Sequence, residues 1–470
     1  MSLVTGIVLG NIAMALLAAV LLWHSTRNAR DLKAALTRTQ LLAATDSLTG
    51  LPNRAELLSR AAKWLAADGR GTTLVVLDLD GFKMINDTLG HQAGDDLLAA
   101  VAGRLQACLG EKGELARLGG DEFAALIPGT DSEAAAIGFI RAAEAALASP
   151  FELSGDTVSM TLSAGIAIGA VRGIDPAELL RRADVAMYAA KATQHRSWAS
   201  FSPDMDESLQ LRRTIGAELE AALVRNELQL VYQPLVCTRT GRVMSAEALM
   251  RWPGKQGQAG SPGVFIPIAE ETGLISKLGD WALDQACIEI KRQKTIPIAV
   301  NVSPVQFRGE GFAESVETAI RRHGIAPELL RLEITEGVLI SHTGEAHRTM
   351  RRLRELGVQV LLDDFGTGYS SLSYLQKFEF DGLKIDRAFI QQLEDGPTGR
   401  RLLQSIISLG HSLNLKVIAE GVETEDQAAL LQLLRCDFLQ GYALGRPDAA
   451  EKLHSLSFTE MLPLTRQRSN

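Results

Sequence analysis

Acidic residues stand directly after apolar, strand-like stretches at several places in this chain. In the segment 358–372, VQVLLDDFGTGYSSL, a short apolar run leads into Asp363 and Asp364, and two glycines then allow a tight turn. A single Asp after a strand often does no more than cap the next helix. Two adjacent carboxylates repel each other unless a cation or a shared proton relieves them, so the pair favours metal binding. Whether other strands end in the same way decides between these interpretations.

The region 209–457 alternates regularly between strand-like and helix-like segments. Strands are expected near 228–233, 243–250, 297–302, 330–335, 358–362, 381–386, 415–420 and 437–442. Eight strands interleaved mostly with helices in about 250 residues predict an α/β fold of the TIM (β/α)8 barrel type. In such a barrel the functional groups lie at the carboxyl ends of the strands.

Seven of these expected strands end in an oxygen ligand or a lysine. The candidates are Glu247, Asn301, Glu333, Asp363 with Asp364, Lys384 with Asp386, Glu420 and Gln440. Any one of them could be a helix cap or a solvated loop residue, but the succession indicates one shared site. Because the candidate ligands are hard oxygen donors, they favour Mg²⁺ or Mn²⁺ over Zn²⁺. The set has room for two ions.

Two chemistries fit a barrel with metal at its mouth. Two ions can activate a water and stabilise the leaving oxygen of a phosphodiester displacement. The alternative is a barrel whose metal stabilises an enolate. Arg251, four residues after Glu247, favours a phosphate because its planar guanidinium suits bidentate contact. The residues alone leave the enolate alternative open.

A second acidic site is expected in the region 46–201. A β-branched apolar run leads into Asp78, and the segment 114–128 is typical of a hairpin with two glycines at its tip, followed by Asp121 and Glu122. A Gly-Gly-Asp turn is also common in ordinary hairpins. In a small α/β palm, however, these strands would place Asp78 and Asp121 side by side. Two such carboxylates can hold Mg²⁺ against a triphosphate during nucleotidyl transfer.

The amino-terminal region is expected to lie apart from both domains. The run 3–23 is uncharged and long enough to cross about 30 Å of hydrocarbon. It is longer than the apolar core of a signal peptide and has no Lys or Arg before it. Basic residues follow at once, which places the downstream chain in the cytoplasm. We expect a single-pass transmembrane helix at 1–23, no extracellular domain, and a helical stalk at 24–45 that could pair two copies.

The composition argues against other classes of protein. With 470 residues the chain exceeds the usual size of one hydrophobic core, so two or three domains are expected. The net charge of −8 argues against a protein that coats a nucleic acid polymer. Four widely spaced cysteines without a CxxC pair argue against a disulfide framework or a zinc site, and they fit a reducing compartment.

The first soluble domain, 46–201, resembles the GGDEF domain of bacterial diguanylate cyclases, which join two GTP molecules into cyclic di-GMP. The matching stretches are DSLTGLPNR (46–54), DLDGFKMINDTLGHQAGD (78–95), RLGGDEF (117–123) and RADVAMYAAK (182–191). The resemblance implies that Mg²⁺ is bound with GTP, that synthesis requires two such domains face to face, and therefore that the protein forms a homodimer. It implies these roles: metal ligation by Asp78, the Leu79 carbonyl and Asp121, guanine recognition by Asn86 and Asp95, phosphate contact by Lys83 and Lys191, and assistance to the attacking 3′-hydroxyl by Glu122.

This domain departs from the family pattern at two places. The family usually continues its last helix with GRN, whereas this chain has Gln194-His195-Arg196, so the phosphate-binding arginine of the family is not assigned here. The product-inhibition motif RxxD should precede the signature, but residues 110–113 read GEKG. Inhibition through that motif is therefore not expected.

The second soluble domain, 209–457, resembles the EAL domain of cyclic di-GMP phosphodiesterases, which open the ring to linear pGpG. The matches are YQPLV (232–236), EALMRW (247–252), FIPIAEETGLI (265–275), NVSPVQF (301–307), EITE (333–336), DDFGTGYSSL (363–372), LKID (383–386), AEGVET (419–424) and QGYALGRP (440–447). Gly337 stands where many relatives have serine.

The EAL resemblance also implies a role for each matching position. Metal ions would be held by Glu247, Asn301, Glu333, Asp363, Asp364 and Glu420, with Glu247 and Glu420 also counted as catalytic; Lys384 would orient the attacking water; Gln233, Arg251 and Gln440 would contact substrate or solvent; Glu336 and Glu423 would brace the DDFGTGYSS loop.

Three hypotheses for function follow. In the first, the EAL domain hydrolyses cyclic di-GMP and the GGDEF domain binds GTP and regulates it. In the second, both domains are active and the net direction can be synthesis. In the third, the chain is a nonenzymatic receptor for cyclic di-GMP at the membrane, which ranks last because no acidic position of either motif is lost. In each case the expected location is the bacterial inner membrane, with both domains in the cytoplasm.

Overall fold

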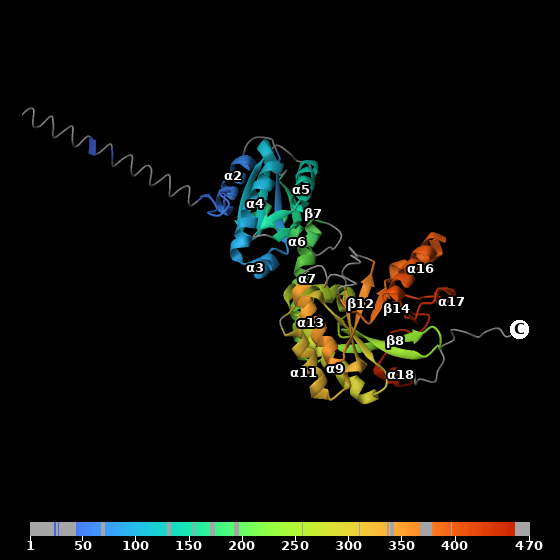
Figure 1. Ribbon diagram of the computed structural model, residues 1–470. Helices are drawn as coiled ribbons and strands as arrows, with labels where there is room; N and C mark the ends of the chain where they lie inside the picture. The colour runs from blue at the N-terminus through green and yellow to red at the C-terminus, as the bar shows by residue number, and fades with distance from the viewer. Residues whose placement is uncertain are drawn as a thin grey trace, which may run out of the picture. The chain divides into compact units, whose positions relative to one another are not determined.

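The computed structural model of the protein describes residues 23–24, 27, 44–66, 71–128, 133–153, 156–169, 174–191, 197–255, 257–309, 311–335, 338, 343–366, 378–395 and 397–455. The expected membrane helix (1–23) and stalk (24–45) lie almost entirely outside these ranges. Within them, no helix combines the length and the apolar character needed to cross a bilayer. The chain divides into two compact units, Met1–Leu211 and Arg212–Asn470 (Figure 1).

The first unit is built on a five-stranded sheet with helices on both faces. The strand order is β2-β3-β1-β6-β7, and the central strand β1 runs antiparallel to β3 and β6. The strands are β1 (Thr72–Asp80), β2 (Glu114–Gly119), β3 (Glu122–Pro128), β6 (Thr161–Gly169) and β7 (Trp198–Ser200), with a separate hairpin of β4 (Phe151–Leu153) and β5 (Asp156–Val158). The helices are α2 (Arg54–Ala66), α3 (Phe82–Leu89), α4 (His91–Leu109), α5 (Glu133–Ala148) and α6 (Pro176–Lys191), with a 3-10 turn, η1 (Gly110–Lys112). The boundary between the two units falls within α7 (Pro203–Val224), whose buried residues Ile215, Leu219 and Ala222 belong to the second unit.

Strand β1 is buried nearly throughout because both of its faces are covered. Val75 and Leu77 pack with α4 and α5 in one cluster, whereas Leu74 and Val76 pack with α2 and α6 in another. Successive strand residues point to opposite faces, so a strand between two helical layers reads as a continuous apolar run. The strand ends in Asp78 and Asp80 at the edge of this core. The expected palm-like strand, helix and 114–128 hairpin are confirmed.

The second unit contains a closed eight-stranded barrel, as the sequence predicted. The order around it is β10-β11-β12-β13-β14-β15-β8-β9. Strand β8 runs antiparallel to both of its neighbours, β9 and β15, and the remaining pairs are parallel. The strands are β8 (Gln229–Cys237), β9 (Val243–Arg251), β10 (Ile298–Val302), β11 (Leu330–Thr335), β12 (Gln359–Phe365), β13 (Gly382–Ile385), β14 (Lys416–Ala419) and β15 (Phe438–Leu439).

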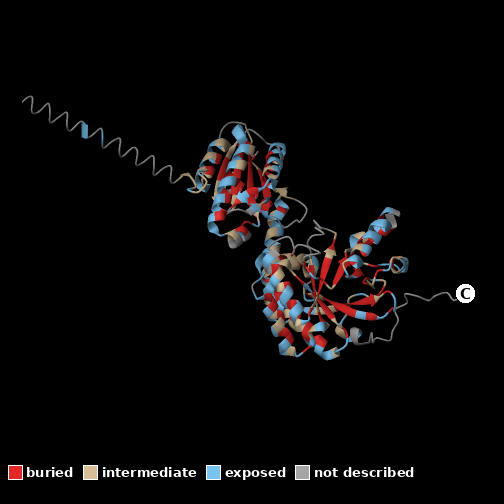
Figure 2. Cartoon of the chain, in the orientation of Figure 1, coloured by how far each residue is buried: buried red, intermediate tan, exposed pale blue. Residues whose placement is uncertain are grey.

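Helices surround the barrel and bury its outer face. They are α8 (Pro262–Thr272), α9 (Ile275–Gln293), α10 (Pro304–Phe307), α11 (Phe312–His323), α13 (Thr343–Leu356), α15 (Arg387–Gln391), α16 (Pro397–Ser412), α17 (Glu425–Leu433) and α18 (Ala450–Ser455), with 3-10 turns η2 (Gln258–Gly260), η3 (Pro327–Leu329) and η4 (Gln392–Asp395). The barrel strands are buried nearly throughout, whereas the helices alternate between buried and exposed faces (Figure 2). This burial holds the strand ends in fixed positions, and the polar groups gather there.

Candidate active sites

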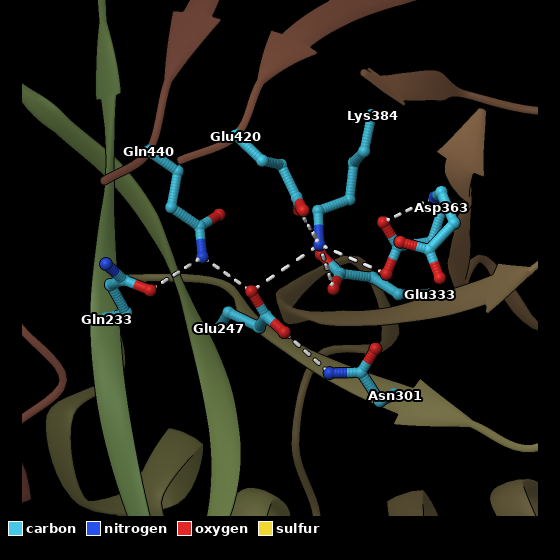
Figure 3. Close-up of polar contacts among 9 residues, drawn as sticks. Gln233, Glu247, Asn301, Glu333, Asp363, Lys384, Glu420 and Gln440 are labelled. Carbon is cyan, nitrogen blue, oxygen red and sulfur yellow. Dashed lines mark hydrogen bonds and ion pairs between the residues drawn. The ribbon is translucent and has the colours of Figure 1, made fainter. Parts of the chain in front are cut away.

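The mouth of the barrel gathers carboxylates from different strands around one lysine (Figure 3). The Lys384 ammonium lies 2.5 Å from Glu333 Oε2 and 3.4 Å from both Glu247 Oε2 and Asp363 Oδ2. It also forms an ion pair with Glu420. Lys384 is only 1% exposed, so its charge is balanced by these carboxylates and not by water.

A chain of amide hydrogen bonds holds Glu247 in place. Asn301 Nδ2 donates to Glu247 Oε1 at 2.6 Å, and Gln440 Nε2 donates to Glu247 Oε2 at 2.5 Å. Gln440 Nε2 also donates to Gln233 Oε1 at 3.2 Å, and Gln233 in turn donates to the Gly445 carbonyl. Glu247 therefore has a fixed orientation that is supported from both sides.

Asp363 and Asp364 face the same site because β12 is irregular at its end. In a regular strand two adjacent side chains point to opposite faces. Here the pairing of β12 with β13 shifts register between Leu362 and Phe365, and Asp364 has φ +54°. A bulge of this kind re-aims a side chain, and left-handed backbone at a non-glycine residue costs about 1–3 kcal/mol. As a result, carboxylate oxygens of Asp363, Asp364 and Glu420 lie within 4.8 Å of one another.

Electrostatic interactions keep Lys384 charged and Glu247 ionised. Burial alone would lower the pKa of Lys384, but the surrounding carboxylates raise it well above its ordinary value. Burial would likewise raise the pKa of Glu247, but the charge of Lys384 and hydrogen bonds from Gln440 and Asn301 outweigh this and lower it. The lysine is thus a permanent donor in this site.

The pKa values of the other carboxyl groups are raised, because the effect of burial outweighs the charge of Lys384. It raises the pKa of Glu333 well above its ordinary value, raises that of Asp363, and raises that of Glu420 to about 8, in each case against the lowering effect of Lys384. Burial, together with the charges of Asp363 and Asp386, raises the pKa of Asp364 to about 6. The site therefore carries more acidic groups than one ammonium can neutralise.

This set of donors fits divalent cations. Glu420 Oε1 is buried and accepts no hydrogen bond of normal geometry, and its close neighbour is the Lys384 ammonium. Hard oxygen donors in excess of the available positive charge are the environment that Mg²⁺ or Mn²⁺ prefers. Among the described residues, Asp363, Asp364 and Glu420 form the acidic group whose spacing suits one ion.

A cavity of about 260 Å³ opens beside these groups. It is lined by Gln233, Glu247, Leu249, Arg387, Glu420, Gly421, Glu423, Gln440, Gly441 and Tyr442. Arg387 forms an ion pair with Glu423 at 2.6 Å. Arg251 is half-buried, donates to the Met250 carbonyl at 2.8 Å, and lies close enough to Glu247 and Tyr442 to interact with them electrostatically. The cavity thus joins acidic, amide and aromatic groups.

The first unit has a smaller acidic site at the end of β1. Asp78 lies opposite Glu122 in the register of β1 and β3, and Lys191 of α6 forms an ion pair with Asp78 at 2.5 Å. Burial raises the pKa of Asp78, as does the nearby charge of Asp121, although Lys191 opposes both. Burial also raises the pKa of Glu122, helped by Asp184 and Asp78. These groups form one electrostatically linked cluster.

The hairpin that carries Asp121 is hydrogen-bonded to Asp46, which precedes α2 in the chain. Arg117 donates to both carboxylate oxygens of Asp46, at 3.0 and 3.1 Å, and to the Gly120 carbonyl at 3.0 and 2.7 Å. Asp46 also accepts from the backbone and hydroxyl of Thr49. Arg117 therefore ties the tip of the hairpin to Asp46.

The remaining candidates of this unit lie on α3 and α4. Asn86 is half-buried, and Gly94 approaches it so closely that a Cβ at position 94 would overlap the Asn86 side chain. Asp95, the next residue, is exposed, as is Lys83 in the first turn of α3. The contact of α3 with α4 therefore places Asn86 beside Gly94, the residue before Asp95, while Lys83 is exposed.

Comparisons with known proteins identify both units. The EAL domain model matches residues 217–447, and the model of the diguanylate cyclase GGDEF domain matches residues 43–197. The bifunctional diguanylate cyclase/cyclic di-GMP phosphodiesterase MucR of Pseudomonas aeruginosa is 39% identical over 96% of this chain and 67% of its own length. This chain belongs to the GGDEF–EAL tandem family.

Two further relatives of the GGDEF–EAL chain bear on function. The cyclic di-GMP phosphodiesterase NbdA of Pseudomonas aeruginosa is 37% identical over 86% of this chain and 52% of its own length. The EAL enzyme Bd1971, solved with cAMP and cyclic di-GMP bound, is 26% identical with a TM-score of 0.52, covering 64% of this chain and 81% of that one. The chain spans 50% to 67% of the length of such curated relatives. MucR and NbdA are thus named as cyclic di-GMP phosphodiesterases, and Bd1971 was solved with cyclic di-GMP bound.

The EAL barrel brings together most of the residues singled out in the sequence. Glu247, Glu333, Asp363 and Glu420 meet at Lys384, and the remaining members of the set surround them: Asn301, Asp364, Gln233 and Gln440. Glu423 is paired with Arg387. Glu336 and the part of its expected partner loop from residue 367 onward lie outside the described residues.

In the GGDEF domain, Asp78, Asp121 and Glu122 are neighbours, with the Leu79 carbonyl next along β1. Lys191 contacts a predicted metal ligand, Asp78, although a phosphate contact was predicted for it. The departure at 194–196 lies outside the described residues.

Sequence reasoning missed the guanidinium and the aromatic ring that line the barrel cavity, Arg387 and Tyr442. Both stand beside motifs that were recognised, since Arg387 follows LKID and Tyr442 lies within QGYALGRP. Their position next to these motifs is the signal that could have found them.

Proposed function

We propose that the EAL barrel hydrolyses cyclic di-GMP to linear pGpG using two divalent cations, Mg²⁺ or Mn²⁺, and that the GGDEF domain binds Mg²⁺ with GTP. The observation that carries the proposal is the convergence of four carboxylates from different strands on Lys384, one of them also bonded to the Asn301 amide, next to a cavity of about 260 Å³. The likeness to MucR, named as a bifunctional cyclase and phosphodiesterase, and to the phosphodiesterase NbdA supports it.

The residues of the barrel would have separate roles in hydrolysis. Bound cations would supply an activated water and stabilise charge on the phosphate and the leaving oxygen. Glu247, Asn301, Glu333, Asp363, Asp364 and Glu420 would hold them. Arg251 would neutralise a phosphate oxygen, since a guanidinium suits bidentate contact. Gln233 and Gln440 keep Glu247 oriented through their hydrogen bonds.

Lys384 would orient the attacking water as a hydrogen-bond donor. The surrounding carboxylates raise its pKa well above the ordinary value, so it stays protonated and cannot accept the proton that water loses. It also balances part of the acidic charge before cations bind. A second role as a positioning residue for the carboxylates follows from its contacts with four of them.

A second candidate function is bifunctional turnover with net synthesis. It is favoured by the intact cluster of Asp78, Asp121 and Glu122 at the end of β1 in the GGDEF domain. Synthesis joins two GTP molecules and would require two copies of the chain, so a homodimer belongs to this proposal. A nonenzymatic receptor is disfavoured because the acidic ligands of the barrel are all present.

We place the chain in the bacterial inner membrane, with both domains in the cytoplasm. The support is the uncharged run at 3–23 and the basic residues that follow it. Fractionation of cells that express the full chain tests this location. Recovery of the protein in the soluble fraction would contradict it.

The test of the main proposal compares two Glu→Gln variants of the purified full chain. Glu247→Gln removes a carboxylate from the site, and we expect pGpG formation from cyclic di-GMP to fall more than about 100-fold, beyond the usual loss for an outer-shell partner. Glu317→Gln on the outer helix α11 is the control and should keep the parent rate. A Glu247→Gln protein that opens the ring at the parent rate would refute the site. Asp121→Asn should abolish any synthesis from GTP.

A further inference from the structure

A large aromatic side chain stands partly exposed beside the phosphodiesterase site. Tyr442 is 52% exposed, although most large hydrophobic side chains of the barrel are buried. It lines the same cavity as Glu247, Gln440 and Leu249. An exposed aromatic ring at the rim of a ligand-sized cavity, near polar groups that would hold a substrate, is typical of a binding surface.

The backbone holds this ring at a fixed place relative to the catalytic groups. Val422 N donates to the Gln440 carbonyl at 3.0 Å, and Ala443 N donates to the Val422 carbonyl at 3.0 Å. Between them, Gly441 has φ +156°, and a Cβ there would overlap the backbone of Val422. Since the Gln440 side chain is bonded to Glu247 (Figure 3), the tyrosine two residues later is positioned with it.

A cation packs on the ring itself. The Arg446 guanidinium lies 4.5 Å from the centre of the Tyr442 ring, a cation–π distance. This contact restrains the ring while about half of the residue stays exposed. The ring is therefore preorganised and still accessible, which lowers the entropy cost of stacking a ligand on it.

Strand β9 presents three side chains of different character near this ring. Glu247, Leu249 and Arg251 alternate along the strand and so share one face, about 7 Å apart. Glu247 is a proposed metal ligand, Leu249 an apolar wall of the cavity, and Arg251 a proposed phosphate contact near Tyr442. A phosphate held at Arg251 would bring the attached nucleoside to the apolar wall and the aromatic ring.

We propose that Tyr442 is the platform on which one guanine base of cyclic di-GMP stacks, and that it contributes the base-dependent part of substrate affinity. The inference rests on the proposed phosphodiesterase function and names a specificity-determining residue for it. Stacking on an aromatic ring uses the π-face of a base and needs no hydrogen bond from the ring. Phenylalanine at this position would therefore serve as well as tyrosine.

The experiment compares two substrates with the full chain and three variants in Mn²⁺ buffer. Cyclic di-GMP carries bases, whereas bis(p-nitrophenyl) phosphate is a diester without them. We expect Tyr442→Ala to raise KM for cyclic di-GMP about 10-fold to 100-fold, the value of one lost stack, with a smaller change in kcat. Its activity on bis(p-nitrophenyl) phosphate should match the parent. Tyr442→Phe and the control Leu433→Ala, another exposed apolar residue, should match the parent on both substrates.

Each outcome has a distinct meaning. An unchanged KM for cyclic di-GMP in Tyr442→Ala overturns the platform. An equal loss on both substrates also overturns it, because the ring would then support the site and not the base. A parent protein inactive on both substrates refutes the proposed hydrolysis itself, so failure of the function and failure of this inference are separable.

Discussion

Replacing Lys384 by methionine should destabilise the metal-free barrel and make its stability depend on cations. The side chain is 1% exposed and contacts four carboxylates, among them Glu333 at 2.5 Å and Glu420. Methionine fills a similar volume without charge. The acidic groups would then be left buried without their shared cation.

The expected loss is about 3–5 kcal/mol of unfolding free energy, the usual result of removing one partner from a buried ion pair. The loss should grow with pH. Burial already raises the pKa of Glu333 and Asp363, and it raises that of Glu420 to about 8. At low pH these groups escape the repulsion by taking up protons, whereas at high pH they cannot. Mn²⁺ should restore most of the lost stability, because a divalent ion can replace the ammonium.

The assay is urea unfolding of the purified full chain in EDTA and in Mn²⁺. Barrel unfolding is followed by the fluorescence of Trp252 and Trp281 after Trp23, Trp64 and Trp198 are changed to Phe in all proteins.

The matched control is Lys416→Met on the neighbouring strand β14. Lys416 is 66% exposed and lies 3.7 Å from Asp437, and such surface pairs contribute about 0–1 kcal/mol. If Lys384→Met and the parent unfold at the same urea concentration in EDTA, the view of Lys384 as the charge centre of the site is wrong.

Three further outcomes are expected. Iodoacetamide at neutral pH should label Cys237 before Cys436, as measured by peptide mass spectrometry. Hydrogen bonds outweigh burial and lower the pKa of Cys237, whereas burial raises the pKa of Cys436 to about 12. Equal labelling rates would contradict this. Gly94→Ala should displace Asn86 and weaken GTP binding about tenfold by calorimetry, and unchanged affinity would exclude Asn86 as a guanine contact. Thermal stabilisation by Mn²⁺ should be larger at pH 8.5 than at pH 6, because burial raises the pKa of Glu420 to about 8 and a protonated carboxyl binds poorly; the opposite trend would refute this.

The barrel could be predicted from sequence because its strands are short apolar runs with clear ends. The register then follows from burial, and Glu247, Asn301 and Glu333 come together because neighbouring strands pair residue by residue, with Asn301 opposite Glu333 and Ala299 opposite Glu247. Periodicity and strand ends are local signals, so they can be recognised in a single sequence.

The rest depends on contacts that no local pattern specifies. A regular strand would have sent Asp363 and Asp364 to opposite faces, and only the irregular pairing of β12 with β13 brings both to the mouth. The antiparallel direction of β8 was also not predicted. Because of it, Gln233 reaches the site from the middle of its strand and not from a carboxyl end. Likewise, the ion pair of Lys191 with Asp78 joins residues 113 positions apart in the chain.

The seam between β15 and β8 closes the barrel with only two residue pairs, Phe438 with Cys237 and Leu439 with Val236. Gln440, which follows at once, bonds to Gln233 and Glu247 across that seam. During synthesis on the ribosome, Glu247 therefore emerges nearly two hundred residues before the amide that orients it. A nascent chain that has exposed every proposed metal ligand would still lack a competent site until the last strand docks.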